Sequence, residues 1–126
     1  MAKKILIIDD HRDLFDAKKM HFENEGFDVV TAYDEQECLI KVKTECPDLI
    51  IFDIAMPKTD EYTFIKAMKT SEDVKHIPII VLTEKDQMEG HFQAEEMIEH
   101  MIKPVRFGVL VGKVRELLKE LEVEKQ

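Results

Sequence analysis

Three short runs of apolar side chains, with no polar residue inside them, constrain the fold of this chain more than any other feature. They span residues 5–8, 49–52 and 79–82. A strand with one face in water alternates apolar and polar residues, whereas an unbroken apolar run of this length is typical of a strand buried on both faces. The runs therefore predict the central strands of a parallel sheet that helices cover on both sides.

Segments of helical length separate these runs. Residues 12–25 carry apolar side chains at helical spacing and stop before Gly26, a residue suited to a helix C-terminus. Asp34 resembles an N-terminal cap, and the helix after it is expected to place Leu39 and Val42 on one face. Both segments are long enough to cross over between parallel strands.

The rest of the chain continues the alternation. A third helix is predicted to start near Asp60, and a last helix with Pro104 in its first turn is predicted to run almost to Gln126. Weaker strands fit at residues 29–32 and 100–102. The order is a strand and a helix repeated five times, which predicts one parallel α/β domain over the whole chain, with no output domain.

Polar residues follow the buried runs where each strand is expected to end. Asp9 and Asp10 follow the first run, Asp53 and Thr83 follow the next two, and Lys103 follows the last strand. Because the carboxyl ends of parallel strands meet at one edge of the sheet, these side chains are expected to converge.

The convergence of three carboxylates predicts a cation among them, because like charges repel in a partly apolar setting. Carboxylate oxygens favour magnesium over zinc, and a metal held in this way can bridge to phosphoryl oxygens. Lys103 would add a second positive charge and Thr83 a hydrogen bond, while one carboxylate could act as a nucleophile. The residue pattern leaves open which carboxylate that is.

The composition of the chain excludes some classes of binding partner. The formal net charge of -9 argues against nucleic acid and against an anionic membrane surface. The N-terminal apolar run is too short for a signal peptide, and no run approaches the roughly 20 apolar residues of a membrane span. The two cysteines are expected to be reduced thiols, and the protein is expected to be cytoplasmic.

The motifs ILIIDDH, PDLIIFDIAMP and PIIVLT, followed by the Lys103-Pro104 pair, occur in this order along the chain. Together they resemble the receiver domain of two-component response regulators, of the stand-alone single-domain type, over essentially the whole sequence. The resemblance implies a flavodoxin-like fold, a doubly wound parallel five-stranded sheet with strand order 2-1-3-4-5. Strands one and three would then lie side by side.

The resemblance also implies roles for the acids. Asp53 corresponds to the phosphoacceptor. Asp9 and Asp10 correspond to the acid pair that holds Mg²⁺, with Asp53 and the backbone carbonyl of Ala55 as further ligands. The protein would then be no enzyme in the usual sense, but a signalling protein that assists its own phosphorylation and dephosphorylation.

Other positions correspond to the residues that change conformation in this family when the phosphoacceptor is phosphorylated. Thr83 matches the hydroxyl residue that moves toward the phosphoryl group, and Lys103 matches the lysine that contacts the phosphoryl oxygens, with a bond to Pro104 that is commonly cis. His100 stands where an aromatic switch residue is usual. Glu84 stands where a small residue usually leaves the site accessible, so we expect it to slow phosphorylation or alter dephosphorylation.

The loop and helix pattern departs from the family in two further places. Glu61 stands where a glycine is usual, which leaves the loop geometry after Asp53 open. Residues 85–99 have a poor helical pattern, and the stretch between Thr83 and Lys103 is shorter than usual. Because family members often use this region for output, these departures bear on the downstream mechanism.

The resemblance implies protein partners. The phosphoryl donor would be a sensor histidine kinase or a histidine phosphotransfer protein that docks near the first helix and the loops around Asp53. Output would pass to a downstream protein through the last two helices and the fifth strand, and family members often dimerise through those helices. The alternatives are a receiver-fold interaction module that acts without phosphorylation, and a metal-dependent phosphohydrolase or flavin-binding protein. No glycine-rich phosphate loop follows the first strand, which argues against the last class.

Overall fold

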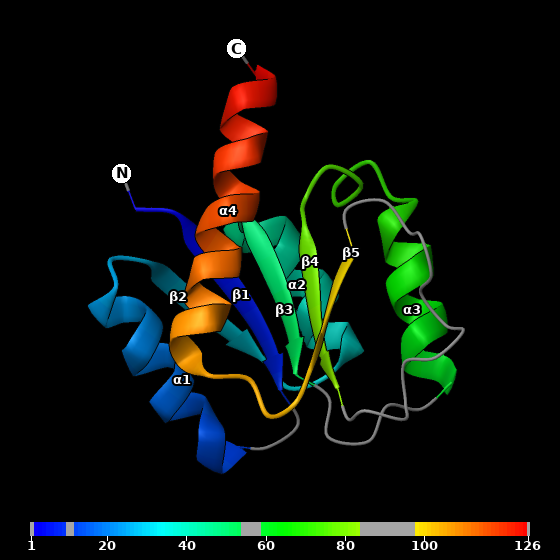
Figure 1. The fold of residues 1–126 in the computed structure, drawn as a ribbon. Helices are drawn as coiled ribbons and strands as arrows, with labels where there is room; N and C mark the ends of the chain where they lie inside the picture. Colours follow the sequence, from blue (N-terminus) through cyan, green and yellow to red (C-terminus); the bar gives the residue numbers. More distant parts are fainter. Residues whose placement is uncertain (1, 10–11, 54–58, 84–97, 126) are drawn as a thin grey trace.

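The computed structural model describes residues 2–9, 12–53, 59–83 and 98–125. Within these ranges strands and helices alternate up to the fourth strand, as the apolar runs predict (Figure 1). The elements follow the order β1 (Lys4–Asp9), α1 (Arg12–Asn24), β2 (Asp28–Ala32), α2 (Glu35–Glu45), β3 (Leu49–Asp53), α3 (Thr59–Lys69), β4 (Ile79–Thr83), β5 (Ile98–Ile102) and α4 (Phe107–Lys125).

The five strands form one parallel sheet in the order β2-β1-β3-β4-β5, which confirms the predicted topology. All arrowheads in Figure 1 therefore point toward the same edge of the sheet. The change of direction in strand order lies at β1, whose carboxyl end is next to that of β3. In register, Asp9 on β1 is opposite Asp53 on β3.

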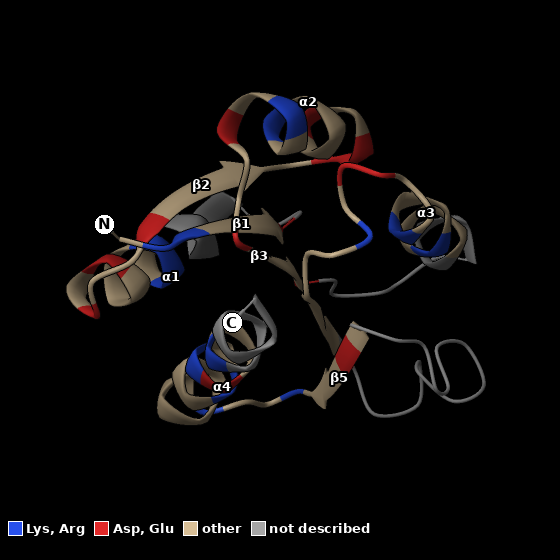
Figure 2. Cartoon of the chain, turned by 90° about the horizontal axis from the view of Figure 1, so that it is seen from above, with Lys and Arg blue, Asp and Glu red and all other residues tan. Residues whose placement is uncertain are grey.

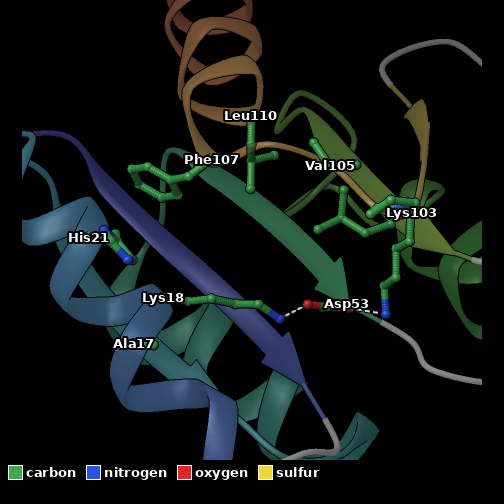
Figure 3. A pocket seen from close by; sticks show the side chains of 10 residues that line it. Ala17, Lys18, His21, Asp53, Lys103, Val105, Phe107 and Leu110 are labelled. Carbon is green, nitrogen blue, oxygen red and sulfur yellow. Dashed lines mark ion pairs between the residues drawn. The ribbon is translucent and has the colours of Figure 1, made fainter.

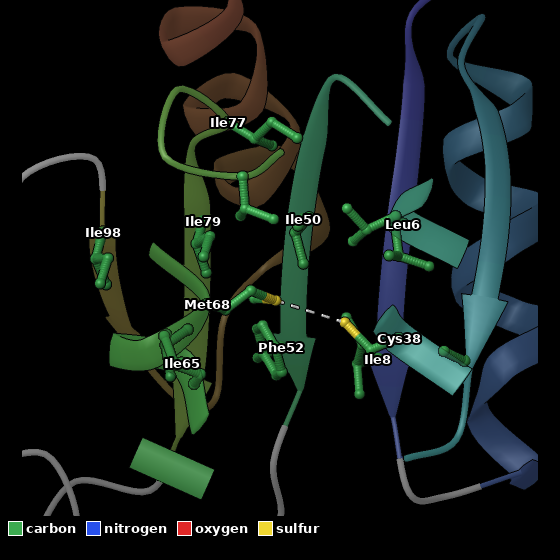
Figure 4. Packing of buried hydrophobic residues seen from close by; sticks show 14 residues of the cluster. Leu6, Ile8, Cys38, Ile50, Phe52, Ile65, Met68, Ile77, Ile79 and Ile98 are labelled. Atoms are coloured by element: carbon green, nitrogen blue, oxygen red, sulfur yellow. Dashed lines mark hydrogen bonds between the residues drawn. The ribbon is translucent and has the colours of Figure 1, made fainter. Parts of the chain in front are cut away.

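Helices cover both faces of the sheet, α2 and α3 on one side and α1 and α4 on the other (Figure 2). Successive side chains of β1 alternate between the two layers. Ile5 and Ile7 belong to the core under α1 and α4, whereas Leu6 and Ile8 belong to the core under α2 and α3 shown in Figure 4. Because both faces are buried, residues 5–8 of β1 and 49–52 of β3 carry no polar side chain before the acids that end these two strands.

The structure corrects the predicted face of α2. The cap is as expected, since the Asp34 carboxylate accepts a hydrogen bond of 2.8 Å from the backbone N–H of Glu37. However, Cys38 and Val42 are the buried residues of this helix, and Leu39 is 44% exposed. Residues four apart lie on one face of a helix, so once Val42 packs inward, Cys38 does so too.

Two element boundaries also differ from the prediction by two residues or more. Strand β5 begins at Ile98, so it includes the end of the poorly patterned segment 85–99, whose other residues lie outside the described ranges. Helix α4 begins at Phe107, three residues after Pro104. Glu61 lies within α3. Among the described helices, none is long and apolar enough to cross a membrane.

Candidate active site

Two buried carboxylates meet at the carboxyl edge of the sheet. Asp9 is 1% exposed and Asp53 is 5% exposed, and they end the neighbouring strands β1 and β3 in register. Side chains two apart on a strand share a face, so both acids lie on the face covered by α1 and α4. The predicted convergence of these two acids is therefore present in the structure.

A lysine from α1 joins them. The Lys18 Nζ lies 2.6 Å from Asp9 Oδ2 and forms an ion pair with Asp53 Oδ2 as well. Figure 3 shows the side chain reaching from α1 toward Asp53. The Lys18 side chain is largely enclosed, with 22% of its surface exposed.

Lys18 was not among the predicted site residues, although the sequence contains a signal for it. Lys18 precedes the fully buried Phe22 by four residues, which places the two on one face of α1. A lysine on the inward face of an amphipathic helix needs an anionic partner or a route to solvent. Which acid supplies that partner depends on how α1 packs on the sheet.

Lys103 approaches Asp53 from the other side (Figure 3). It follows the end of β5, and its ammonium forms an ion pair with Asp53 Oδ1. The Lys103–Pro104 peptide bond is cis, as the family resemblance implies. Asp53 thus has one ammonium on each carboxylate oxygen, and these two lysines formally balance the charges of Asp53 and Asp9.

His100 does not join this cluster. It shares a face of β5 with Ile98, which packs in the core under α2 and α3, so it lies on the opposite face of the sheet from Asp53. Its side chain is half-buried, and burial lowers the pKa of His100 below its ordinary value, while Glu99 acts in the other direction. The proposed switch position is therefore separated from the acids by the sheet.

Other predicted site residues are only partly covered by the structure. Asp10, Ala55 and Glu84 lie outside the described residues. Thr83 ends β4, opposite Ile102 of β5 in register, so its backbone lies at the expected edge of the sheet. The side chain of Thr83 is not among those described.

A pocket of about 600 Å³ opens beside Asp53, between α1 and α4. Its walls combine the polar groups of the site with apolar side chains: Ala17, Lys18, His21, Asp53, Leu82, Lys103, Pro104, Val105, Phe107 and Leu110. The Phe107 ring lies 4.7 Å from the His21 ring and 4.8 Å from the Phe22 ring, measured between centroids. These contacts hold α4 against α1 and so help to position Lys18.

The acid pair suits a hard divalent cation. Asp9 and Asp53 offer carboxylate oxygens, the donors that Mg²⁺ prefers, and their Oδ2 atoms already converge on one cation, the Lys18 ammonium. The donor chemistry therefore fits Mg²⁺. Within the described part of the chain, no group of three or more His, Cys, Asp and Glu residues is arranged to hold a metal, and the third acid of the predicted set, Asp10, lies outside that part.

Comparison with known proteins identifies the family of the chain. The family model described as response regulator receiver domain matches residues 5–115. A relative in Bacillus subtilis, the alkaline phosphatase synthesis transcriptional regulatory protein PhoP, is 33% identical over 125 residues. The alignment covers 98% of this chain and 51% of the relative, so the chain spans about half the length of the curated relatives it matches.

Solved structures agree in fold. A CheY-like receiver domain protein from Methanospirillum hungatei superposes with a TM-score of 0.81 at 30% identity, over 98% of this chain and 99% of that one. The chemotaxis response regulator CheY4 of Vibrio cholerae gives a TM-score of 0.79 at 25% identity, over 93% and 99% of the two chains. Both similarities extend over nearly the full length of each protein.

Proposed function

The chain belongs to the family of response regulator receiver domains, and from this premise we propose that it accepts a phosphoryl group on Asp53. Receiver domains are signalling proteins of two-component phosphorelays and are generally not enzymes. The observation that carries the proposal is the environment of Asp53. Its carboxylate is buried at the edge of the sheet, next to Asp9 and between the ammonium groups of Lys18 and Lys103.

The proposed chemistry follows from this arrangement. An oxygen of Asp53 attacks the phosphorus of the donor, an O–P bond forms, and the bond from phosphorus to the donor's nitrogen or oxygen breaks. Negative charge spreads over the phosphoryl oxygens during the transfer. Lys103, which pairs with Asp53 Oδ1, is placed to offset that charge.

Receiver domains generally bind Mg²⁺ at the phosphorylation site. In this chain Asp9, Asp10 and Asp53, with the backbone carbonyl of Ala55, would hold the ion. When bound, it supplies further positive charge to the phosphoryl oxygens. Asp9 and Asp53 would hold the ion together, because their carboxylates end neighbouring strands in register.

The proposed partners follow from the family. Receiver domains interact with histidine kinases or phosphotransfer proteins. In this chain we expect the donor to approach the edge of the sheet beside α1, where Asp53 lies next to the pocket. The signal would then pass to a downstream protein, with Thr83, Lys103 and His100 taking part in the switch and Glu84 limiting access. The comparisons do not favour the alternative of a module that signals without phosphate.

Incubation with acetyl phosphate and Mg²⁺, followed by intact-mass measurement, tests the proposal. We expect one added phosphoryl group on the parent protein and none on Asp53→Asn. Asp73→Asn is the matched control, because it removes one negative charge at an exposed position away from the sheet edge. An adduct that persists in Asp53→Asn, or its absence from the parent at saturating Mg²⁺, would contradict the assignment.

A second comparison tests the access residue. Glu84→Ala should be phosphorylated faster than the parent under the same conditions, or should lose the phosphoryl group at a different rate. Identical rates of both steps in the two proteins would remove any role for Glu84.

A further inference from the structure

Lys18 lies where a bound metal ion would meet the two acids. Its ammonium is 2.6 Å from Asp9 Oδ2 and is also paired with Asp53 Oδ2. We propose that Lys18 is an internal cation that competes with Mg²⁺ for Asp9 and Asp53. The inference rests on the proposed magnesium site and adds a residue that controls when the site can be loaded.

The competition follows from the geometry of the oxygens. Magnesium binds carboxylate oxygens at about 2.1 Å in a strict octahedron. An ammonium that contacts both Oδ2 atoms occupies the space between them, and two cations at that separation repel strongly in a poorly hydrated site. Binding of the metal through these oxygens therefore requires the Lys18 ammonium to withdraw.

Burial makes the ammonium important in the metal-free protein. Asp9 is 1% exposed and Asp53 is 5% exposed, so water does little to reduce the repulsion between their charges. Lys18 provides a positive charge to both. The cation expected among the acids is therefore already present in the metal-free protein as the Lys18 ammonium.

The pocket between α1 and α4 offers Lys18 a place to move. Lys18 itself lines this pocket, together with Ala17 and His21 of the same helix and Phe107 and Leu110 of α4. Its volume of about 600 Å³ is much larger than a lysine side chain. The methylene stem can lie along the apolar wall while the ammonium reaches water at the pocket mouth.

Lys103 has a different position. It pairs with Asp53 Oδ1, the oxygen that does not contact Lys18, and it comes from the link between β5 and α4. A metal on the Oδ2 side leaves this contact in place. Binding of the metal should thus displace Lys18 from the acids and leave Lys103 paired with Asp53.

Mg²⁺ titrations of three proteins test the inference. The dissociation constant is measured by isothermal titration calorimetry for the parent, Lys18→Met and Lys19→Met. Lys19 is exposed on the same helix, so its variant makes the same change in net charge away from the acids. We expect Lys18→Met to bind Mg²⁺ about tenfold more tightly or better, and Lys19→Met to stay within about twofold of the parent.

Thermal unfolding gives a second readout. Without metal, Lys18→Met should melt below the parent, because the acids lose a neutralising partner, and saturating Mg²⁺ should raise its Tm by more than it raises that of the parent. Equal or weaker Mg²⁺ binding by Lys18→Met would overturn the inference. A matching gain in Lys19→Met would do so as well, since it would show a general effect of charge.

The parent protein itself provides a test that does not depend on a variant that folds. In NMR spectra of the lysine ammonium groups, the Lys18 signal should shift as Mg²⁺ is added, with the same midpoint as the calorimetric titration. A Lys18 signal unchanged at saturation would overturn the competition. Failure of Asp53 phosphorylation in a protein that still shows the exchange would instead count against the proposed function alone.

Discussion

Replacing Phe22 by alanine should detach α1 from its supports and lower the stability of the whole domain. Phe22 is fully buried, and its ring packs edge-on against Phe107 of α4 at 4.8 Å and against Phe27 at 6.0 Å. Truncation of a buried phenylalanine costs about 3–5 kcal/mol of unfolding free energy, part of which comes from the lost ring pairs. We take about 4 kcal/mol as the expected loss.

The expected change in melting temperature follows from the size of the chain. For 126 residues the unfolding entropy near the midpoint is about 0.26 kcal/mol/K. A loss of about 4 kcal/mol therefore lowers the Tm by about 15 °C. Because Lys18 lies one turn before Phe22, the variant should also bind Mg²⁺ with a changed affinity.

The assay is thermal unfolding followed by far-UV circular dichroism, since the chain has no tryptophan to report on folding. Met20→Ala on the same helix is the matched control. Met20 is 60% exposed, so its truncation should change the unfolding free energy by less than about 0.5 kcal/mol. A fall of less than about 4 °C for Phe22→Ala, equivalent to about 1 kcal/mol, would refute the packing described for α1 and α4.

Two further predictions concern titratable side chains. Burial lowers the pKa of His100 from its ordinary 6.5, with a partial offset from Glu99, so the unfolded chain binds more protons than the folded one. The stability that the neutral His100 contributes is present above about pH 6.5 and declines as the pH falls below that value. Between about pH 7.5 and 5.5 the Tm of His100→Asn should therefore fall less than the Tm of the parent. Equal falls in the two proteins would contradict the lowered pKa of His100. Burial, with an added effect of Glu35, raises the pKa of the Cys38 thiol to about 12, whereas Cys46 is exposed. A thiol reagent at neutral pH should therefore modify Cys46 alone in the native protein and both cysteines after unfolding, and Cys46→Ser should abolish the native reaction. Rapid native modification of Cys38 would count against this packing.

The central strands could be predicted from local pattern because their burial is nearly uniform. Residues 5–8 and 49–52 are apolar throughout since helices cover both faces of β1 and β3, and any interruption would leave a polar group without water. Strand β5 begins two residues earlier than the local pattern predicts. Its Glu99 is only partly buried and pairs with Lys113 of α4 at 2.9 Å, so the apolar run that identifies the other strands is missing.

The face of α2 shows where local pattern stops being sufficient. Cys38 and Leu39 are adjacent and both apolar, and either could begin an inward stripe that continues through Val42. The choice depends on the angle at which the helix meets the sheet. In the structure Cys38 packs against Met68 of α3, with a distance of 3.9 Å between the sulfur atoms, and Leu39 is left exposed.

The order of residues along the chain was enough to establish a parallel sheet, its buried strands and the meeting of Asp9 with Asp53, because each of these follows from where an apolar run ends. Only the tertiary structure decided that Lys18 neutralises both acids. The ammonium reaches them through the packing of α1 on β1 and β3, which brings together groups nine and thirty-five positions apart. Charge pairing across such separations depends on distances in space, and no spacing along the chain encodes them.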